Sequence, residues 1–258
     1  MLSHGTCDLS LLDLPTATLV VIVAGLVVGA LAKGTLGAGL PALGLPIMVM
    51  RIEPAEAVGL FIVPVLISNI WQAVEAGHLR EAARKFWPFL AMLVIGVWFG
   101  AGALTTVDPK KITLGLGCLV VCTTLAQMFT GSLKILTGGT RYINPLAGVV
   151  LGACGGATGT FAAVIVYFAA LRLHKDLFIS QLALAAMFGS VPLYLRLLAD
   201  DRLSWAQLEA STLALVPASL GLIAGFWLRS RITEIVFRRA VWMCLLLLGT
   251  ALIWRGLG

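Results

Sequence analysis

Charged residues are scarce in this chain. Lys, Arg, Asp and Glu together make up only 12% of its 258 residues, whereas a soluble globular domain carries roughly a quarter. Long polar segments are missing as well, because the longest, Ser132 to Asn144, is too short to fold by itself. These shortages exclude an ordinary soluble protein and predict a single integral membrane domain over residues 1–258.

Motifs of the common enzyme classes are also missing. The sequence has no His and Glu at metal-ligand spacing, no nucleophile elbow and no P-loop lysine. Four of the five cysteines lie inside apolar runs, which favours packing over a disulfide framework. Residues 1–16 contain no Lys or Arg, so the positive region of a signal peptide is not expected there. The sequence therefore predicts no enzyme, no metal and no cofactor.

Apolar runs fill most of the chain instead. Hydrophobic residues make up 60% of it, and the mean hydropathy is +1.01. Because a membrane-spanning helix needs about 20 apolar residues, the runs predict an all-α polytopic membrane protein with about 8–10 membrane segments. Ten apolar segments can be read, at residues 17–33, 36–50, 54–75, 87–106, 112–130, 145–156, 158–172, 178–198, 206–228 and 236–255.

The chain also repeats itself. The glycines of Gly25-xxx-Gly29 recur at Gly148-xxx-Gly152, and those of Gly96-xxx-Gly100 recur at Gly221-xxx-Gly225, at offsets of 123 and 125 residues. These matches predict a first repeat over residues 17–130, a cytoplasmic linker over 131–144 and a second repeat over 145–256. Five segments in each repeat make the two repeats inverted, and each would contain a glycine-broken helical hairpin (17–50 and 145–172).

The placement of basic residues predicts the orientation. We assume that each glycine-broken hairpin begins and ends on the same side of the membrane. Eleven Lys and Arg residues then lie on one side and six on the other. Because cytoplasmic loops carry the excess of Lys and Arg, the first set is predicted to be cytoplasmic. We therefore expect a multi-pass protein of the cell inner membrane with both termini in the periplasm. The net charge of +6 therefore reflects basic loops that set the orientation, and nucleic acid is not an expected partner.

The glycine-rich breaks are the expected substrate site. A helix that begins inside the membrane presents unpaired N–H groups with partial positive charge, which suits an anion. The alternative is that these glycines only allow close helix packing. The breaks supply most of the candidate substrate-binding residues: Thr35, Gly37, Ala38, Gly39, Gly156, Thr158, Gly159 and Thr160.

Polar residues inside apolar segments complete the candidate site. Lys33 precedes the first break, where it is expected either to attract an anion or to reach the headgroups. Asn69 and Gln72 share a helix face with Ser68, and Gln181 lies near the start of a later segment. Substrate binding and hydrogen bonding between helices are the two interpretations of these residues.

The motifs together resemble those of the sulfite exporter TauE/SafE family. The resemblance runs from about Ala24 to Trp254 and includes Gly37 to Pro41, Pro64 to Gln72, Gly152 to Thr160 and Pro217 to Gly225. The family is described as membrane permeases for sulfite, sulfoacetate and other organosulfonates. One departure is Ala38, where the family often has a third consecutive glycine.

These observations predict a secondary transporter of a small anion, and the resemblance implies a sulfur-containing one. Export driven by the membrane potential is favoured, because no buried carboxylate stands out as a proton carrier. A coupled proton and a homodimer are further candidate partners. The alternatives are an anion channel, a passive scaffold, a carrier of another small organic solute, or an intramembrane enzyme.

Overall fold

The computed structural model describes residues 15–129, 140–171, 173–231 and 233–258, and these form helices without any strand. Most of the predicted linker at 131–144 lies outside this described part. The helices are α1 (Thr16–Leu36), α2 (Leu40–Met48), α3 (Pro54–Leu60), α4 (Ile62–Ala76), α5 (Leu79–Thr106), α6 (Pro109–Phe129), α7 (Thr140–Thr158), α8 (Ala162–Ala170), α9 (Lys175–Ala199), α10 (Trp205–Leu213), α11 (Leu215–Arg229) and α12 (Glu234–Leu257).

Each apolar segment predicted from the sequence corresponds to one helix or to one bent pair of helices, so the all-α membrane fold is confirmed. Six helices are long and apolar enough to cross a membrane, and the bent pair α3–α4 makes a seventh. This number is smaller than the predicted 8–10 segments for a reason of length. Both α2 and α8 have nine residues, which is about 14 Å of helix against a hydrocarbon core of about 30 Å. The apolar part of α7, Ile143–Thr158, is also too short.

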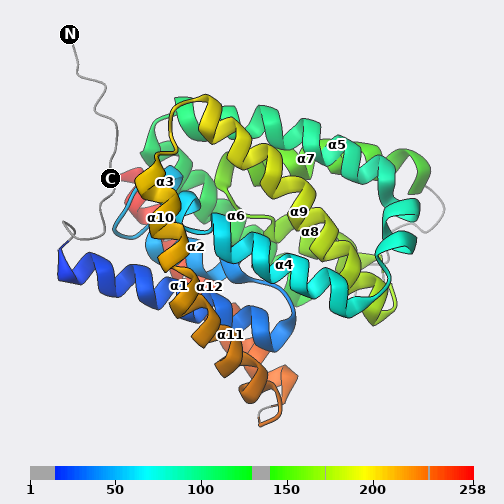
Figure 1. Ribbon diagram of the computed structural model, residues 1–258. Helices are drawn as coiled ribbons and strands as arrows, with labels where there is room; N and C mark the ends of the chain where they lie inside the picture. Colours follow the sequence, from blue (N-terminus) through cyan, green and yellow to red (C-terminus); the bar gives the residue numbers. More distant parts are fainter. Residues whose placement is uncertain (1–14, 130–139, 172, 232) are drawn as a thin grey trace.

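The long helices pack in pairs around the short ones. α5 lies along α7, α1 lies along α11, and α12 lies along α6, while α4 packs against α9. Figure 1 shows α5 and α7 in the upper part of the molecule and α1, α11 and α12 in the lower left, with α4 between them. The start of α1 and the C-terminus lie at the same end, where Lys110 Nζ donates to Gly258 O at 3.2 Å.

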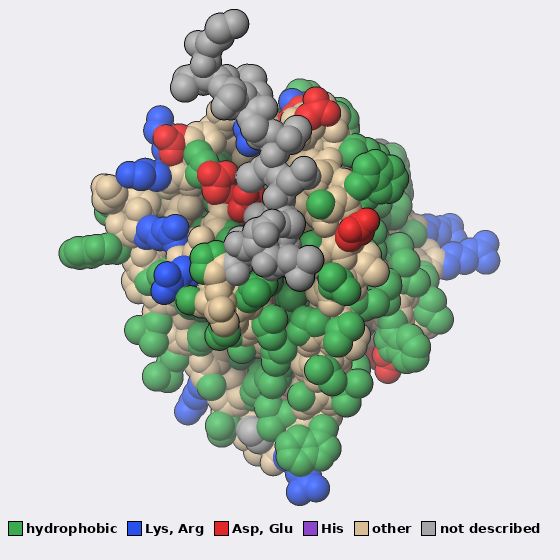
Figure 2. All heavy atoms as spheres, turned by 60° about the vertical axis from the view of Figure 1, so that its left-hand side comes forward, with side chains coloured by type: hydrophobic (Ala, Val, Ile, Leu, Met, Phe, Trp, Pro, Cys, Tyr) green, Lys and Arg blue, Asp and Glu red, His purple; other side chains and the backbone are tan. Residues whose placement is uncertain are grey.

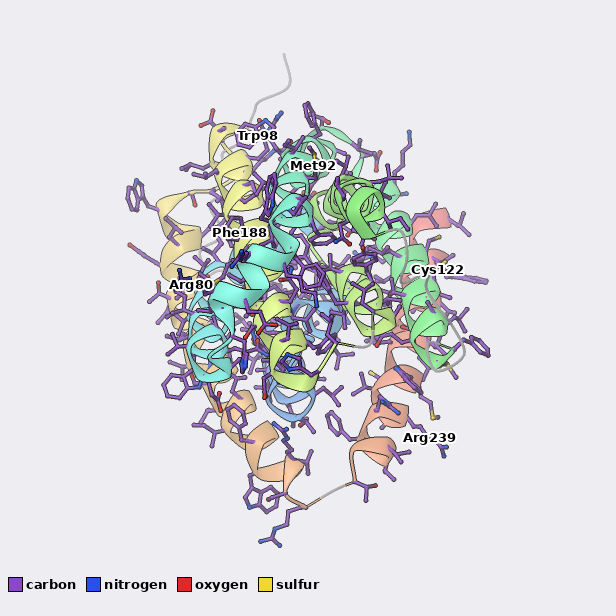
Figure 3. The ribbon with its side chains drawn as sticks, turned by 90° about the vertical axis from the view of Figure 1, so that its right-hand side faces the viewer. Arg80, Met92, Trp98, Cys122, Phe188 and Arg239 are labelled. Carbon is purple, nitrogen blue, oxygen red and sulfur yellow. The ribbon has the colours of Figure 1, made fainter. Side chains whose placement is uncertain are left out.

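The exterior of the molecule is apolar. Figure 2 shows hydrophobic side chains over the middle and lower parts of one face, with several Asp and Glu side chains toward its top. Figure 3 shows Cys122 on α6 and Phe188 on α9, and both side chains are exposed. Trp254 is 84% exposed. Such a surface is stable only against lipid or another apolar partner, as expected of a polytopic membrane protein.

A proline explains the bend between α3 and α4. Pro64 has no N–H, so the carbonyl of Leu60 loses its helical partner, and the two helices bend by 48°. Ser211 of α10 fills the gap: its hydroxyl donates to Leu60 O at 3.1 Å and accepts from Val63 N at 2.9 Å. The bend is thereby tied to the second half of the chain.

We expect Ser211→Ala to lower the free energy of unfolding by about 1–3 kcal/mol, because it leaves two buried backbone groups unpaired. Thr212→Ala on the same helix is the control, since the Thr212 hydroxyl is exposed and bonds only within its own helix, to Leu208 O. Thermal unfolding in detergent measures both variants. Equal melting temperatures for the two would contradict this account of the bend.

Candidate functional site

Two helix breaks face each other in the middle of the molecule. α1 ends at Gly37, which has a φ of 81°, and α2 begins after Gly39, which has a φ of 120°. α7 ends before Gly159, with a φ of 73°, and α8 begins after Phe161. These positive φ angles favour glycine, so the glycine clusters stop the helices where the sequence predicted.

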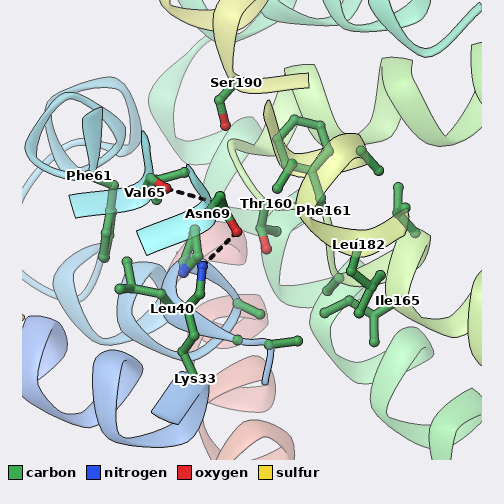
Figure 4. Close-up of a pocket in the computed structure, with 18 of the residues that line it drawn as sticks. Lys33, Leu40, Phe61, Val65, Asn69, Thr160, Phe161, Ile165, Leu182 and Ser190 are labelled. Carbon is green, nitrogen blue, oxygen red and sulfur yellow. Dashed lines mark hydrogen bonds between the residues drawn. The ribbon is translucent and has the colours of Figure 1, made fainter. Parts of the chain in front are cut away.

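The starts of α2 and α8 line one small cavity between the breaks, here called the central cavity (Figure 4). Its volume is about 70 Å³. Leu40 and Ala162 are the first residues of the two short helices, and both line it. The unpaired N–H groups of a helix start carry partial positive charge, so both helix ends favour an anion here. Polar side chains are contributed by Lys33, Asn69, Gln72, Thr160, Ser190 and Tyr194.

Lys33 is the charged residue of the central cavity. It lies in the last turn of α1 and is 7% exposed. Its Nζ donates to Asn69 Oδ1 at 2.6 Å and to Ser68 Oγ at 3.0 Å. Asn69 is oriented for this role, because its own Nδ2 donates to Val65 O at 2.8 Å. Figure 4 shows both Asn69 bonds.

No carboxylate among the described residues forms an ion pair with Lys33. The described residues that line the central cavity include neither Asp nor Glu. A buried ammonium is unfavourable unless a charge or several hydrogen bonds compensate for its lost hydration. Ser68 and Asn69 supply two neutral acceptors, and neither carries a negative charge. With Lys33 protonated, the cavity is therefore complementary to an anion.

Thr160 adds a hydroxyl without a partner. It is 1% exposed, and its Oγ1 has no hydrogen-bond partner among the described residues. Figure 4 shows the Thr160 side chain next to that of Asn69, at the end of the cavity that Lys33 approaches. Leaving a buried hydroxyl unpaired costs about 1–3 kcal/mol, which a ligand oxygen would offset.

Two side chains of α9 complete the wall and were missed from the sequence. Ser190 is 2% exposed, lines the cavity, and is hydrogen-bonded to Tyr194 one turn later. Figure 4 shows Ser190 on the side opposite Lys33. A signal was present, because Ser190 follows Ser68 by 122 residues, one fewer than the offset between Gly25 and Gly148.

The predicted site residues fall into two groups. Those that line the central cavity are Lys33, Gly37, Ala38, Gly39, Asn69, Gln72, Gly159 and Thr160. Four others do not line it. Thr35 donates to Leu31 O and Gly225 O, and Thr158 donates to Cys154 O. Gly156 packs against the backbone of α5 at Val97. Gln181 is fully buried, without a partner among the described residues.

A second, larger cavity lies behind the central one and is here called the vestibule. Its volume is about 630 Å³, and it extends between α4, α11 and the start of α9, with Glu75, Asp176 and Arg229 in its wall. Lys33, Gly37 and Gln72 line both cavities. Gln72 Nε2 donates to the carbonyl of Gly37. This bond and the bonds of Lys33 form the wall between the two cavities.

A comparison with protein families agrees with this geometry. The profile of the family described as sulfite exporter TauE/SafE matches residues 21–252, nearly the whole chain. The chain belongs to the TauE/SafE family. No curated protein and no solved structure gives a match.

Family membership and fold together assign a general role. TauE/SafE proteins are transporters of sulfur-containing anions, and the helices described above make this member a multi-pass membrane protein. Its partners are accordingly a small anion and the lipid bilayer. Among the described residues no group of three His, Cys, Asp or Glu is arranged to hold a metal ion.

Proposed function

We propose that this TauE/SafE protein exports a small sulfur oxyanion, such as sulfite or an organosulfonate, by alternating access, with the anion bound in the central cavity. The observation that carries the proposal is Lys33, a buried lysine without a carboxylate partner among the residues that line that cavity. The free hydroxyl of Thr160 and the helix starts at Leu40 and Ala162 supply donors for the oxygens of the anion.

An inverted repeat supports alternating access. α2 and α8 have the same length and are offset by 122 residues. Gly221 and Gly225 of α11 pack on α1, while Gly96 and Gly100 of α5 pack on α7. These reciprocal contacts are expected when two repeats with the same fold are inverted. Motion of one half against the other would then expose the central cavity to each side in turn.

The wall between the two cavities favours a carrier over a channel. A channel needs a continuous water-filled path, whereas Gln72 and Gly37 close the central cavity off from the vestibule. Export is the expected direction because the substrate is an anion. An inside-negative potential drives an anion outward with about 2.3 kcal/mol per charge per 100 mV. For the orientation, we retain periplasmic termini in the inner membrane, on the basis of the excess of Lys and Arg at the opposite end.

The test is thermal stabilisation of the purified protein by sulfite, sulfoacetate, taurine, sulfate, chloride and acetate. A ligand that binds only the folded state raises the melting temperature, and we expect this shift with at least one sulfur oxyanion. Thr160→Val should reduce the shift, because a hydroxyl donor to the anion is lost. Thr158→Val is the matched control, since that hydroxyl bonds Cys154 O instead of facing the cavity. If no anion stabilised the wild-type protein, the proposal would fail.

A further inference from the structure

The two ends of the molecule differ in how tightly they are closed. At one end α5 packs closely along α9, and at the other α11 contacts α4 only sparsely, leaving the vestibule between them. In the predicted repeat, the α10–α11 pair is the counterpart of α5, and the α3–α4 pair is the counterpart of α9. α10 packs on α3 and α4, so the difference lies in α11. The repeat makes the contact of α5 with α9 equivalent to the contact of α11 with α4. The first contact is tightly packed, whereas the second leaves a cavity.

A cluster of four residues, here called the latch, fastens the closed end. Thr105 at the end of α5 donates to the carboxylate of Asp200, just beyond α9. Arg196 pairs with Asp200 at 2.9 Å, and Arg202 donates to Thr105 O at 3.0 Å. The Arg196 guanidinium also lies 5.6 Å from the centre of the Trp98 ring, and Figure 3 shows Trp98 toward this end of α5, away from Arg80 at its start.

The electrostatics of the latch favour an ionised Asp200. Burial would raise the pKa of its carboxyl, but the hydrogen bonds from Thr105 and Arg196 and the charges of Arg196 and Arg202 lower it overall. A carboxylate held between two guanidinium groups stabilises the contact between α5 and α9. The latch therefore fastens α5 to α9 at this end of the molecule.

The vestibule end also carries two side chains of opposite charge, but they are not paired with each other. Glu75 lies in the last turn of α4, and Arg229 is the last residue of α11. Both line the vestibule, both are exposed, and neither forms an ion pair with a described residue. Movement of α11 toward α4, into the arrangement that α5 already has with α9, would bring the two charges together.

We propose that Glu75 and Arg229 form the gate of the vestibule end, pairing only in the conformation in which the latch of Thr105, Arg196, Asp200 and Arg202 has opened. In this structure the vestibule is then open toward its own end of the molecule, predicted to be the cytoplasmic side, while the Gln72–Gly37 bond still separates it from the central cavity. The two gates are never open together, so the anion leaves the central cavity by one end or the other. This inference rests on the proposed alternating access, although it does not depend on which solute is carried.

Disulfide cross-linking in membranes tests the two gates. The full-length chain, with its five native cysteines replaced, receives either Thr105→Cys with Asp200→Cys or Glu75→Cys with Arg229→Cys. We expect both pairs to cross-link under mild oxidant. Glu81→Cys with Arg231→Cys is the control, because both residues are exposed at the same end and neither lines the vestibule. The control pair should remain reduced.

Two reporter cysteines then show which end is open. Ser219→Cys lies in the vestibule wall, and Leu193→Cys lies in the central cavity. With positions 105 and 200 cross-linked, an impermeant thiol reagent should label position 219 from the vestibule side and leave position 193 unlabelled from the other side. With positions 75 and 229 cross-linked, the pattern should reverse.

The inference is overturned if positions 75 and 229 do not cross-link while positions 105 and 200 do. It is also overturned if the 75–229 cross-link leaves the labelling of position 193 unchanged. The charge-swap variant Glu75→Arg with Arg229→Glu gives a second readout: each single change should reduce transport at least tenfold, and the double change should restore most of it. Labelling requires no anion, so the gates are tested separately from the binding of any substrate.

Discussion

Lys33→Met is expected to abolish the stabilisation of this protein by sulfur oxyanions. Removing one partner of a buried, hydrogen-bonded charge pair costs about 2–5 kcal/mol of binding free energy, which weakens binding by about 30-fold to about 4,000-fold. Methionine keeps the helical propensity and most of the volume of lysine, so the change removes mainly the charge. Thermal shift with the best anion of the panel measures the effect.

Without any anion, the Lys33→Met protein should remain folded and should not lose thermal stability. Replacing a buried charge by an apolar group of similar size is often neutral or stabilising, so the melting temperature without anion should stay the same or rise. Lys110→Met is the control, since Lys110 is exposed at the end of the molecule that holds the C-terminus. An unchanged anion shift in Lys33→Met would remove Lys33 from the site.

Gly100→Ala is expected to cause the second large effect, a loss of stability. A Cβ at Gly100 would lie 2.1 Å from the carbonyl oxygen of Ala153, in the closely packed pair of α5 and α7. The backbones must move apart to admit it, because neither atom belongs to a flexible side chain. We expect the free energy of unfolding to fall by about 1–3 kcal/mol, measured by thermal unfolding in detergent.

Gly115→Ala is the matched control for this variant. A Cβ at Gly115 of α6 meets nothing within 4 Å, and alanine is the better helix former by about 1 kcal/mol. This variant should therefore be as stable as the wild-type protein or more stable. If both substitutions lowered the melting temperature equally, close packing at Gly100 would not explain the glycine pattern.

The helices were largely predictable because lipid imposes a simple rule on the sequence. A spanning helix must be long and apolar, and its ends are marked by charge, glycine or proline. The segments read at 54–75 and 206–228 each proved to be two helices, α3–α4 and α10–α11. The first of these breaks depends on Pro64 together with Ser211, which is distant in the sequence and supplies the missing bonds.

The site was less predictable, because helix rotation decides which residues face the cavity. Thr158 and Thr160 are two residues apart, yet one bonds its own helix and the other faces the cavity. Thr35 similarly points to α11, through its bond to Gly225 O. Ser190 and Tyr194 were missed because they form no motif of their own, and the offset of Ser190 from Ser68 was the signal that could have found the serine. Only the packing of the helices decides which of these side chains face the cavity.

The most direct test of the central claim is the flux of sulfite or an organosulfonate, chosen by thermal shift, into proteoliposomes at a set membrane potential. The account predicts a saturable, potential-driven current with the wild-type protein and at least a 30-fold smaller one with Lys33→Met, since the anion must bind the central cavity to cross. A current that rises linearly with anion concentration, or one that Lys33→Met leaves unchanged, would contradict a carrier that binds its anion at Lys33.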